Sequence, residues 1–132
     1  MALIMIVDDE VIVRQLFERV LQGQGHEVVV ASNGREALTL MQMRLPDLVM
    51  LDLTMPVMDG TSFLRSMRRR PEWKDVPVIV ISGVVDRHEV IRVKQLGISD
   101  YILKTNFEMN DLRQRLAKHL PKPRGAKART AV

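Results

Sequence analysis

The chain has 132 residues, of which 46% are hydrophobic and 27% charged, and such a length and composition are typical of one globular domain. Cysteine is absent, which excludes a disulfide framework, a thiolate nucleophile and a cysteine-ligated metal site. No apolar run approaches the ~20 residues of a membrane span, and the N-terminus lacks the basic region of a signal peptide, so we expect a cytoplasmic protein with no membrane partner.

The net charge of +4 has a local source. Residues 121–132, PKPRGAKARTAV, hold four basic residues and no acid, so the other 16 basic residues balance the 16 acidic ones. A proline- and glycine-containing basic segment with few large apolar groups is typical of disorder. We therefore expect a neutral domain over residues 1–120 and a basic, disordered tail over 121–132. Nucleic acid is therefore not an expected partner of the domain or of the tail.

Five short apolar runs alternate along the chain with segments of helical periodicity. None of the runs alternates polar and apolar residues over its whole length, a pattern that favours strands buried on both faces of a parallel sheet. The runs are Leu3–Val7, Val28–Ala31, Leu48–Leu51, Val78–Ile81 and Tyr101–Leu103.

Each run is followed by a segment that reads as a helix. The first ends near Gly23 and Gly25, and the second begins with Asn33 and Glu36 in the spacing of a capping box. The third follows Gly60 and stops before Pro71, the fourth precedes Gly97, and the last covers Met109 to Leu120. Five strand–helix pairs predict a doubly wound α/β domain.

Candidate site residues follow four of the five predicted strands, whereas the second is followed by Ser32 and no charged residue. Ligands of open parallel sheets bind beyond the carboxyl ends of the strands, so these residues should converge on one edge. They are Asp8 and Asp9 after the first run, Asp52 after the third, Ser82 after the fourth and Lys104 after the fifth. Taken singly, each has a plainer interpretation, such as a helix cap for Asp8 and Asp9 or a turn cap for Asp52. Their joint placement at the strand ends is what favours a functional site.

Three carboxylates form an oxygen-rich site that suits Mg²⁺. Lys104 would add a positive charge for a phosphate, and Ser82 a hydrogen-bond donor. A carboxylate can also be the nucleophile that takes up a phosphoryl group. Asp52 is the best candidate for that role, because it is central and is followed by a loop that can line the site.

These residues lie in motifs that resemble the receiver domain of two-component response regulators. The motifs are VDDE with Asp8 and Asp9, LDLTMPVMDG with Asp52, ISG with Ser82, and LGISDYILK with Tyr101 and Lys104, and the resemblance covers about Leu3 to Leu120. It implies a flavodoxin-like (βα)5 fold with strand order 2-1-3-4-5. It also implies a phosphorylation switch in which Asp52 accepts a phosphoryl group from a histidine kinase or a histidine phosphotransfer protein.

The resemblance implies a role for each remaining site residue. Asp9, Asp52 and the backbone carbonyl of Thr54 would bind Mg²⁺, with Asp8 assisting. Ser82 and Lys104 would hold the phosphoryl oxygens, and Tyr101 would turn inward on activation. The output would be altered binding of a downstream protein, and a homodimer is compatible with the family.

Two features depart from the family pattern. The family usually has proline directly after the lysine, whereas this chain has Thr105 and Asn106 before Phe107. Because a cis bond before a residue other than proline costs ~2.5–4 kcal/mol, we expect a trans Lys104–Thr105 bond, an Asn106 cap on the last helix, and a lysine that still reaches Asp52. In addition, no output domain follows residue 120 in this sequence. We therefore expect a stand-alone receiver similar to chemotaxis regulators, or a receiver cut from a longer chain.

Two other functions fit part of the pattern. A phosphatase of the haloacid-dehalogenase type also uses an Asp nucleophile, Mg²⁺ and a lysine, but it needs a second Asp where this chain has Thr54. A receiver-like binding module that is never phosphorylated would have no need of the acidic residues or the lysine. We therefore expect a switch that takes up and can lose its own phosphoryl group, and not a turnover enzyme.

Overall fold

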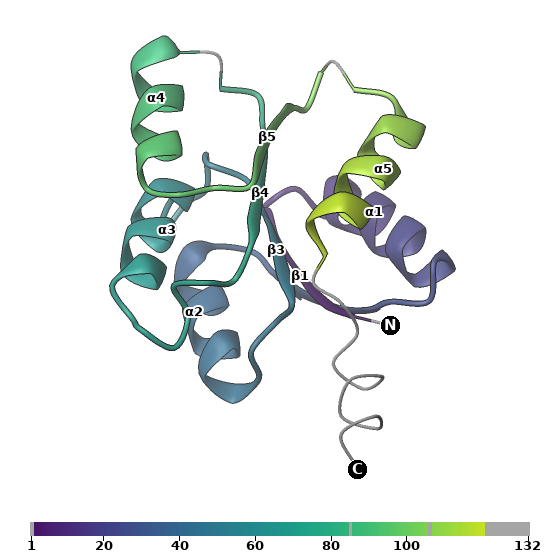
Figure 1. Ribbon diagram of the computed structural model, residues 1–132, viewed down its shortest axis with the longest axis horizontal. Helices are drawn as coiled ribbons and strands as arrows, with labels where there is room; N and C mark the ends of the chain where they lie inside the picture. Colours follow the sequence, from purple (N-terminus) through teal and green to yellow (C-terminus); the bar gives the residue numbers. More distant parts are fainter. Residues whose placement is uncertain (1, 85, 106, 121–132) are drawn as a thin grey trace.

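Five strands and five helices alternate along the computed structural model, which describes residues 2–84, 86–105 and 107–120 (Figure 1). The strands are β1 (Leu3–Val7), β2 (Glu27–Ala31), β3 (Leu48–Leu51), β4 (Val78–Ser82) and β5 (Asp100–Leu103). The helices are α1 (Val11–Gly23), α2 (Gly34–Met43), α3 (Gly60–Arg68), α4 (Arg87–Gln95) and α5 (Met109–His119). Every apolar run is therefore a strand, with an end shifted by one residue in β2, β4 and β5. The predicted tail lies outside the described residues.

The strands form one parallel sheet in the order β2-β1-β3-β4-β5, which confirms the predicted flavodoxin-like topology. Helices α1 and α5 lie on one face of the sheet, and α2, α3 and α4 on the other (Figure 1). In the described parts of the chain, every helix is too short or too polar to cross a bilayer.

Alternation along the central strands divides the core into two layers. Met5 and Val7 of β1 pack on the side of α2, α3 and α4, whereas Ile4 and Ile6 pack on the side of α1 and α5. All residues of β1, β3 and β4 are buried, as predicted. The same prediction was wrong for β2 and β5, which are partly exposed. Both lie at sheet edges, where no strand covers the outer side.

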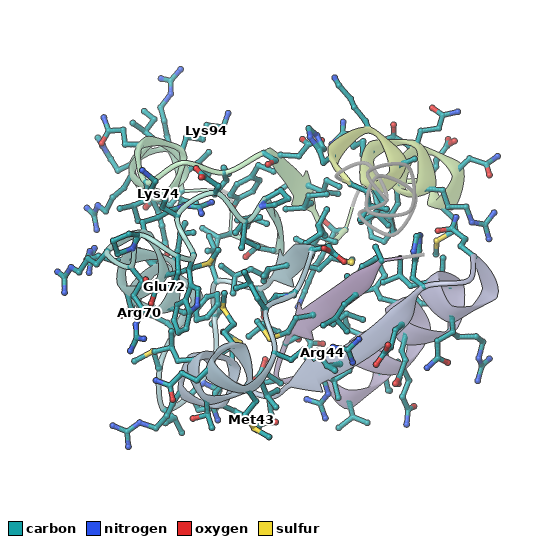
Figure 2. The ribbon with its side chains drawn as sticks, turned by 60° about the horizontal axis from the view of Figure 1, so that its bottom comes forward. Met43, Arg44, Arg70, Glu72, Lys74 and Lys94 are labelled. Atoms are coloured by element: carbon teal, nitrogen blue, oxygen red, sulfur yellow. The ribbon has the colours of Figure 1, made fainter. Side chains whose placement is uncertain are left out.

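The helix ends follow local chemistry. Asn33 accepts a hydrogen bond from the Glu36 N–H at 2.9 Å, as expected of the α2 cap. The third helix ends at Arg68, before the Arg70–Pro71 bond, because proline disfavours a helical conformation in the residue before it. The loop that follows carries an exposed ion pair between Arg70 and Glu72 at 3.6 Å (Figure 2).

The last helix begins at Met109, as predicted, and ends at His119, one residue before the predicted end. Its N-cap is Glu108, which makes no side-chain cap hydrogen bond, and Asn106, the residue expected to cap this helix, lies outside the described residues. An N-cap directly precedes the first helical residue, and α5 begins two residues later than an Asn106 cap requires.

Candidate functional site

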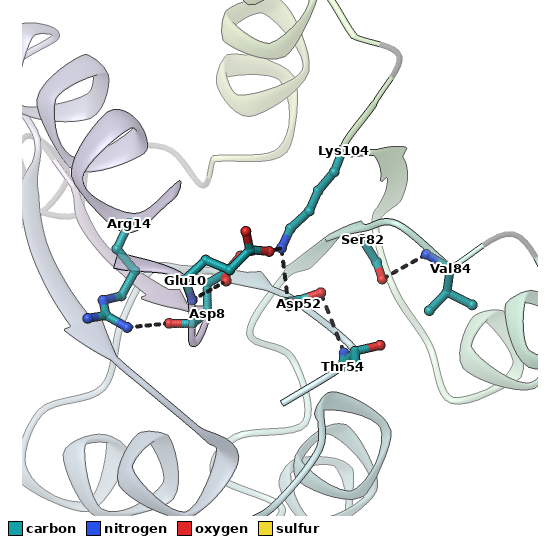
Figure 3. A network of polar contacts seen from close by, with 8 residues as sticks. All are labelled: Asp8, Glu10, Arg14, Asp52, Thr54, Ser82, Val84 and Lys104. Carbon is teal, nitrogen blue, oxygen red and sulfur yellow. Dashed lines mark hydrogen bonds and ion pairs between the residues drawn. The ribbon is translucent and has the colours of Figure 1, made fainter. Parts of the chain in front are cut away.

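The carboxyl ends of β1, β3, β4 and β5 meet at one edge of the sheet, as the parallel topology requires (Figure 3). Asp8, Asp52, Ser82 and Lys104 all lie there. Next to them is an open pocket of about 460 Å³, which is lined by Asp9, Glu10, Asp52, Thr54, Gly83, Val84 and Lys104. The fold therefore brings the five predicted residues together at one site, although they belong to four separate segments of the chain.

Asp52 is held by backbone contacts at the end of β3. Its N–H donates to the Val7 carbonyl at 2.9 Å, and its side chain is only 4% exposed. The loop after it folds back tightly, since a Cβ atom on Gly60 would lie 2.2 Å from the Asp52 carbonyl oxygen. Within this loop the backbone of Val57 has a φ of 67°, a left-handed conformation that is unfavourable for a β-branched residue. The fold thus fixes the direction of the Asp52 carboxylate.

Asp8 and Asp9 differ in exposure although they are adjacent. Asp8 is buried and its Oδ1 accepts from the Glu10 N–H at 2.9 Å, whereas Asp9 is exposed and lines the pocket. The N-cap of α1 is Glu10, without a side-chain cap hydrogen bond. The plainer interpretation, in which these two aspartates cap α1, is therefore wrong.

Lys104 bridges three carboxylates. Its Nζ lies 2.8 Å from Glu10 Oε1, 2.9 Å from Asp8 Oδ2 and 3.2 Å from Asp52 Oδ2. No described peptide bond is cis, so the Lys104–Thr105 bond is trans; the predictions of a trans bond and of a lysine that reaches Asp52 are confirmed. Glu10 was not among the predicted site residues. Its position directly after Asp8 and Asp9, beyond the end of β1, could have identified it as a site residue.

Burial and neighbouring charges shift the two central pKa values. Burial raises the pKa of Asp52, and the Asp8 carboxylate raises it further, while Lys104 opposes both effects. Burial alone would lower the pKa of Lys104, but Glu10, Asp8 and Asp52 together raise it well above its ordinary value. The lysine is therefore fully charged at neutral pH, and the Asp52 carboxylate is less stable as an anion than it would be in water.

Ser82 and Tyr101 both contact the backbone of Val84, in the loop after β4. The buried Ser82 Oγ accepts from the Val84 N–H at 3.2 Å, and the Tyr101 hydroxyl donates to the Val84 carbonyl at 2.7 Å. Tyr101 is half-buried, and this burial raises its pKa. A movement of the Val84 backbone would therefore change the hydrogen bonds of both side chains.

The acidic residues fit a divalent cation. Asp8, Asp9, Glu10 and Asp52 each offer a carboxylate oxygen, and these oxygens lie within 4.8 Å of one another. An all-oxygen donor set with two exposed members suits Mg²⁺, which retains water ligands. Thr54 lies on the same pocket wall.

Comparison with known proteins identifies the family to which this site belongs. Residues 4–117 match the family model described as the response regulator receiver domain. The chain belongs to the response regulator receiver family. It is therefore related to signalling switches of two-component systems, and the fold and motifs predicted from the sequence agree with this membership.

Individual relatives show how far the similarity extends. The receiver is 37% identical over 113 residues to a probable transcriptional regulator, ycf27, of Cyanophora paradoxa, covering 86% of this chain and 46% of the relative. It is 34% identical over 111 residues to the regulator of RpoS of Escherichia coli K12, covering 84% of this chain and 32% of the relative. The chain thus spans less than half the length of these curated relatives.

A solved structure matches over nearly its full length. The chemotaxis protein CheY4 of Vibrio cholerae superposes with a TM-score of 0.83 at 31% identity, covering 91% of this chain and 99% of that chain. The receiver fold of this chain is therefore similar to that of a chemotaxis protein.

Proposed function

We propose that this receiver accepts a phosphoryl group on Asp52 and thereby switches its binding of a downstream protein. The observation that carries the proposal is the contact of a buried carboxylate, Asp52, with a charged lysine, Lys104, at 3.2 Å inside an acidic pocket. The family supports a histidine kinase or a histidine phosphotransfer protein as donor. A downstream protein as partner, a homodimer and a cytoplasmic location remain predictions.

In the proposed reaction, an Asp52 carboxylate oxygen attacks the phosphorus of a phosphohistidine. The new P–O bond forms as the P–N bond breaks, and the electron pair of that bond stays on the imidazole nitrogen. Asp8, Asp9, Asp52 and the Thr54 carbonyl would hold Mg²⁺, which supplies positive charge that offsets the repulsion between the carboxylates and the incoming phosphate. Lys104 would bind a phosphoryl oxygen, because its ammonium already reaches Asp52.

The switch is proposed to operate through Ser82 and Tyr101. A phosphoryl group carries about −1.5 to −2 charge and attracts hydrogen bonds from Ser82 and Lys104. At ~1.5–3 kcal/mol each, two such bonds approach the ~5.5 kcal/mol that turns a 1:99 population into 99:1. Ser82 Oγ accepts from the Val84 N–H, so a rotation of the serine that directs its hydroxyl proton at a phosphoryl oxygen would shift the backbone segment that Tyr101 contacts.

The phosphatase alternative finds no support at this site. Thr54 stands where that chemistry needs a second acid, and it has no carboxylate. Uptake of one phosphoryl group by a switch, without turnover of a substrate, is therefore the reaction that we propose.

A small acyl phosphate donor tests the proposal directly. With Mg²⁺ present, mass spectrometry should place one phosphoryl adduct on Asp52, and Asp52→Asn should abolish it. The exposed Asp59 caps α3 and provides a matched control, because Asp59→Asn should still be labelled. Equal labelling of wild type in EDTA, or labelling of Asp52→Asn, would show that the proposal is wrong.

A further inference from the structure

Glu10 makes one side-chain contact in the described parts of the chain, and that contact is with Lys104. The Glu10 side chain is 60% exposed and its Oε1 accepts from the Lys104 Nζ at 2.8 Å. It does not cap α1, although Glu10 occupies the N-cap position. This carboxylate therefore serves neither the helix nor the core.

The other two carboxylates that bind Lys104 are buried, unlike that of Glu10. The side chains of Asp8 and Asp52 are 5% and 4% exposed, and their Oδ2 atoms lie 2.9 Å and 3.2 Å from the ammonium. The same residues belong to the oxygen cluster that fits a divalent cation. The ammonium therefore occupies oxygens that a bound cation needs, and the two charges compete for them.

Glu10 belongs to the same oxygen cluster, but its carboxylate is exposed, so the ammonium can stay bound to Glu10 while a cation takes the oxygens of Asp8 and Asp52. Glu10 lies at the exposed rim of the pocket, and Lys104 side-chain exposure is only 16%, so the ammonium is held between the rim and the buried aspartates (Figure 3). We propose that Glu10 is a positioning residue: it keeps the Lys104 ammonium at the rim and so weakens its competition with Mg²⁺ for Asp8 and Asp52. The inference rests on the proposed function, since it concerns the same cation site.

Loss of the Glu10 charge should therefore leave Lys104 dependent on Asp8 and Asp52. A simple through-space effect of Glu10 on the cation would also weaken Mg²⁺ binding, but it would not require Lys104. The two explanations differ in a double-mutant cycle, because only the positioning role makes the effect of Glu10 depend on the lysine.

The experiment is a Mg²⁺ titration followed by backbone amide NMR shifts, including the Thr54 N–H beside Asp52. It uses wild type, Glu10→Gln, Lys104→Met and the double variant, with Glu18→Gln on α1 as a control of equal charge change. We expect Glu10→Gln to raise the Kd for Mg²⁺ about three- to tenfold, and less than about twofold when Lys104 is already Met. Lys104→Met alone should lower the Kd, and Glu18→Gln should change it less than about twofold.

Two results would overturn the inference. Equal weakening by Glu10→Gln in both backgrounds would mean that Glu10 acts as a cation ligand or a distant charge. An unchanged Kd would mean that it has no role in cation binding. Lys104→Gln completes the cycle if the Met variant does not fold. A wild type that fails to bind millimolar Mg²⁺ would instead contradict the proposed function, so the two failures are distinguishable.

Discussion

Replacement of Asp52 by Asn should stabilise the fold at neutral pH in the absence of divalent cations. The carboxylate is nearly fully buried, and burial is the main cause of its raised pKa. Asn has almost the same shape and no charge. Lys104 loses one partner but keeps Asp8 at 2.9 Å and Glu10 at 2.8 Å, so the substitution leaves no unpaired ammonium.

The size of the gain follows from three contributions. Lys104 attracts the Asp52 carboxylate at 3.2 Å, and Asp8, with an oxygen within 4.8 Å, repels it. A pair of unit charges at such distances is worth roughly 4 kcal/mol at an effective dielectric constant of about 20, so the two contributions largely offset. Desolvation remains, and a buried polar group without full compensation costs about 1–3 kcal/mol. At about 3–5 °C per kcal/mol for a domain of this size, Tm should rise by roughly 3–15 °C.

The gain should depend on pH with a definite sign. An acid whose pKa is raised on folding favours the protonated form in the folded state, so its ionisation reduces the free energy of unfolding as pH rises through the folded pKa. Below the unfolded pKa of about 3.9, Asp52 is neutral in both states and that cost disappears. The stability difference between Asp52→Asn and wild type should therefore be large at neutral pH and shrink on acidification.

Thermal and urea unfolding in EDTA, followed by circular dichroism at neutral pH and at successively lower pH, measures this difference. Other carboxylates titrate in both proteins, so subtraction isolates Asp52. An Asn variant that is less stable than wild type at neutral pH would refute the reasoning. So would a difference that stays constant with pH.

Three further substitutions test how the fold supports the site, each by the midpoint of urea unfolding. Gly60→Ala should lower the free energy of unfolding by about 3 kcal/mol or more, because the new Cβ would lie 2.2 Å from the Asp52 carbonyl oxygen. An unchanged free energy would mean that the loop can move freely. Arg68→Met should lower the free energy of unfolding by about 2–4 kcal/mol, through loss of hydrogen bonds to carbonyls in the loop before β4 and the loop after α4. The exposed Arg65→Met should change it by less than about 0.5 kcal/mol. Val57→Gly should raise the free energy of unfolding by about 0.5–1 kcal/mol, because glycine adopts a φ of 67° without strain. A lower free energy of unfolding would show that the valine side chain packs favourably.

The order of the elements and the residues at the strand ends could be predicted from the sequence. Apolar runs bounded by helical segments identify parallel strands, and parallel strands bring their carboxyl ends to one edge whatever the details of packing. Asp52 and Lys104, 52 positions apart, could therefore be placed together. The trans Lys104–Thr105 bond was also predictable, since it depends on local covalent energetics.

Edge exposure and helix capping required the tertiary structure. The predicted runs Val28–Ala31 and Tyr101–Leu103 contain no charged residue, like those of the central strands, and the partial exposure of β2 and β5 reflects their place at the edges of the sheet. The N-cap of α5 is Glu108, which the sequence did not single out as a cap and which makes no side-chain cap hydrogen bond.

Only the tertiary structure decided how the site residues share their partners. The sequence placed a lysine near carboxylates, but side-chain reach and burial determine that Glu10 is one of three that bind it. Likewise, Ser82 and Tyr101 were predicted as switch residues, yet their meeting at the Val84 backbone depends on the path of the loop after β4. Sequence periodicity specifies which residues reach one edge of a sheet, whereas distances of a few ångströms between their atoms are set by packing of the whole domain.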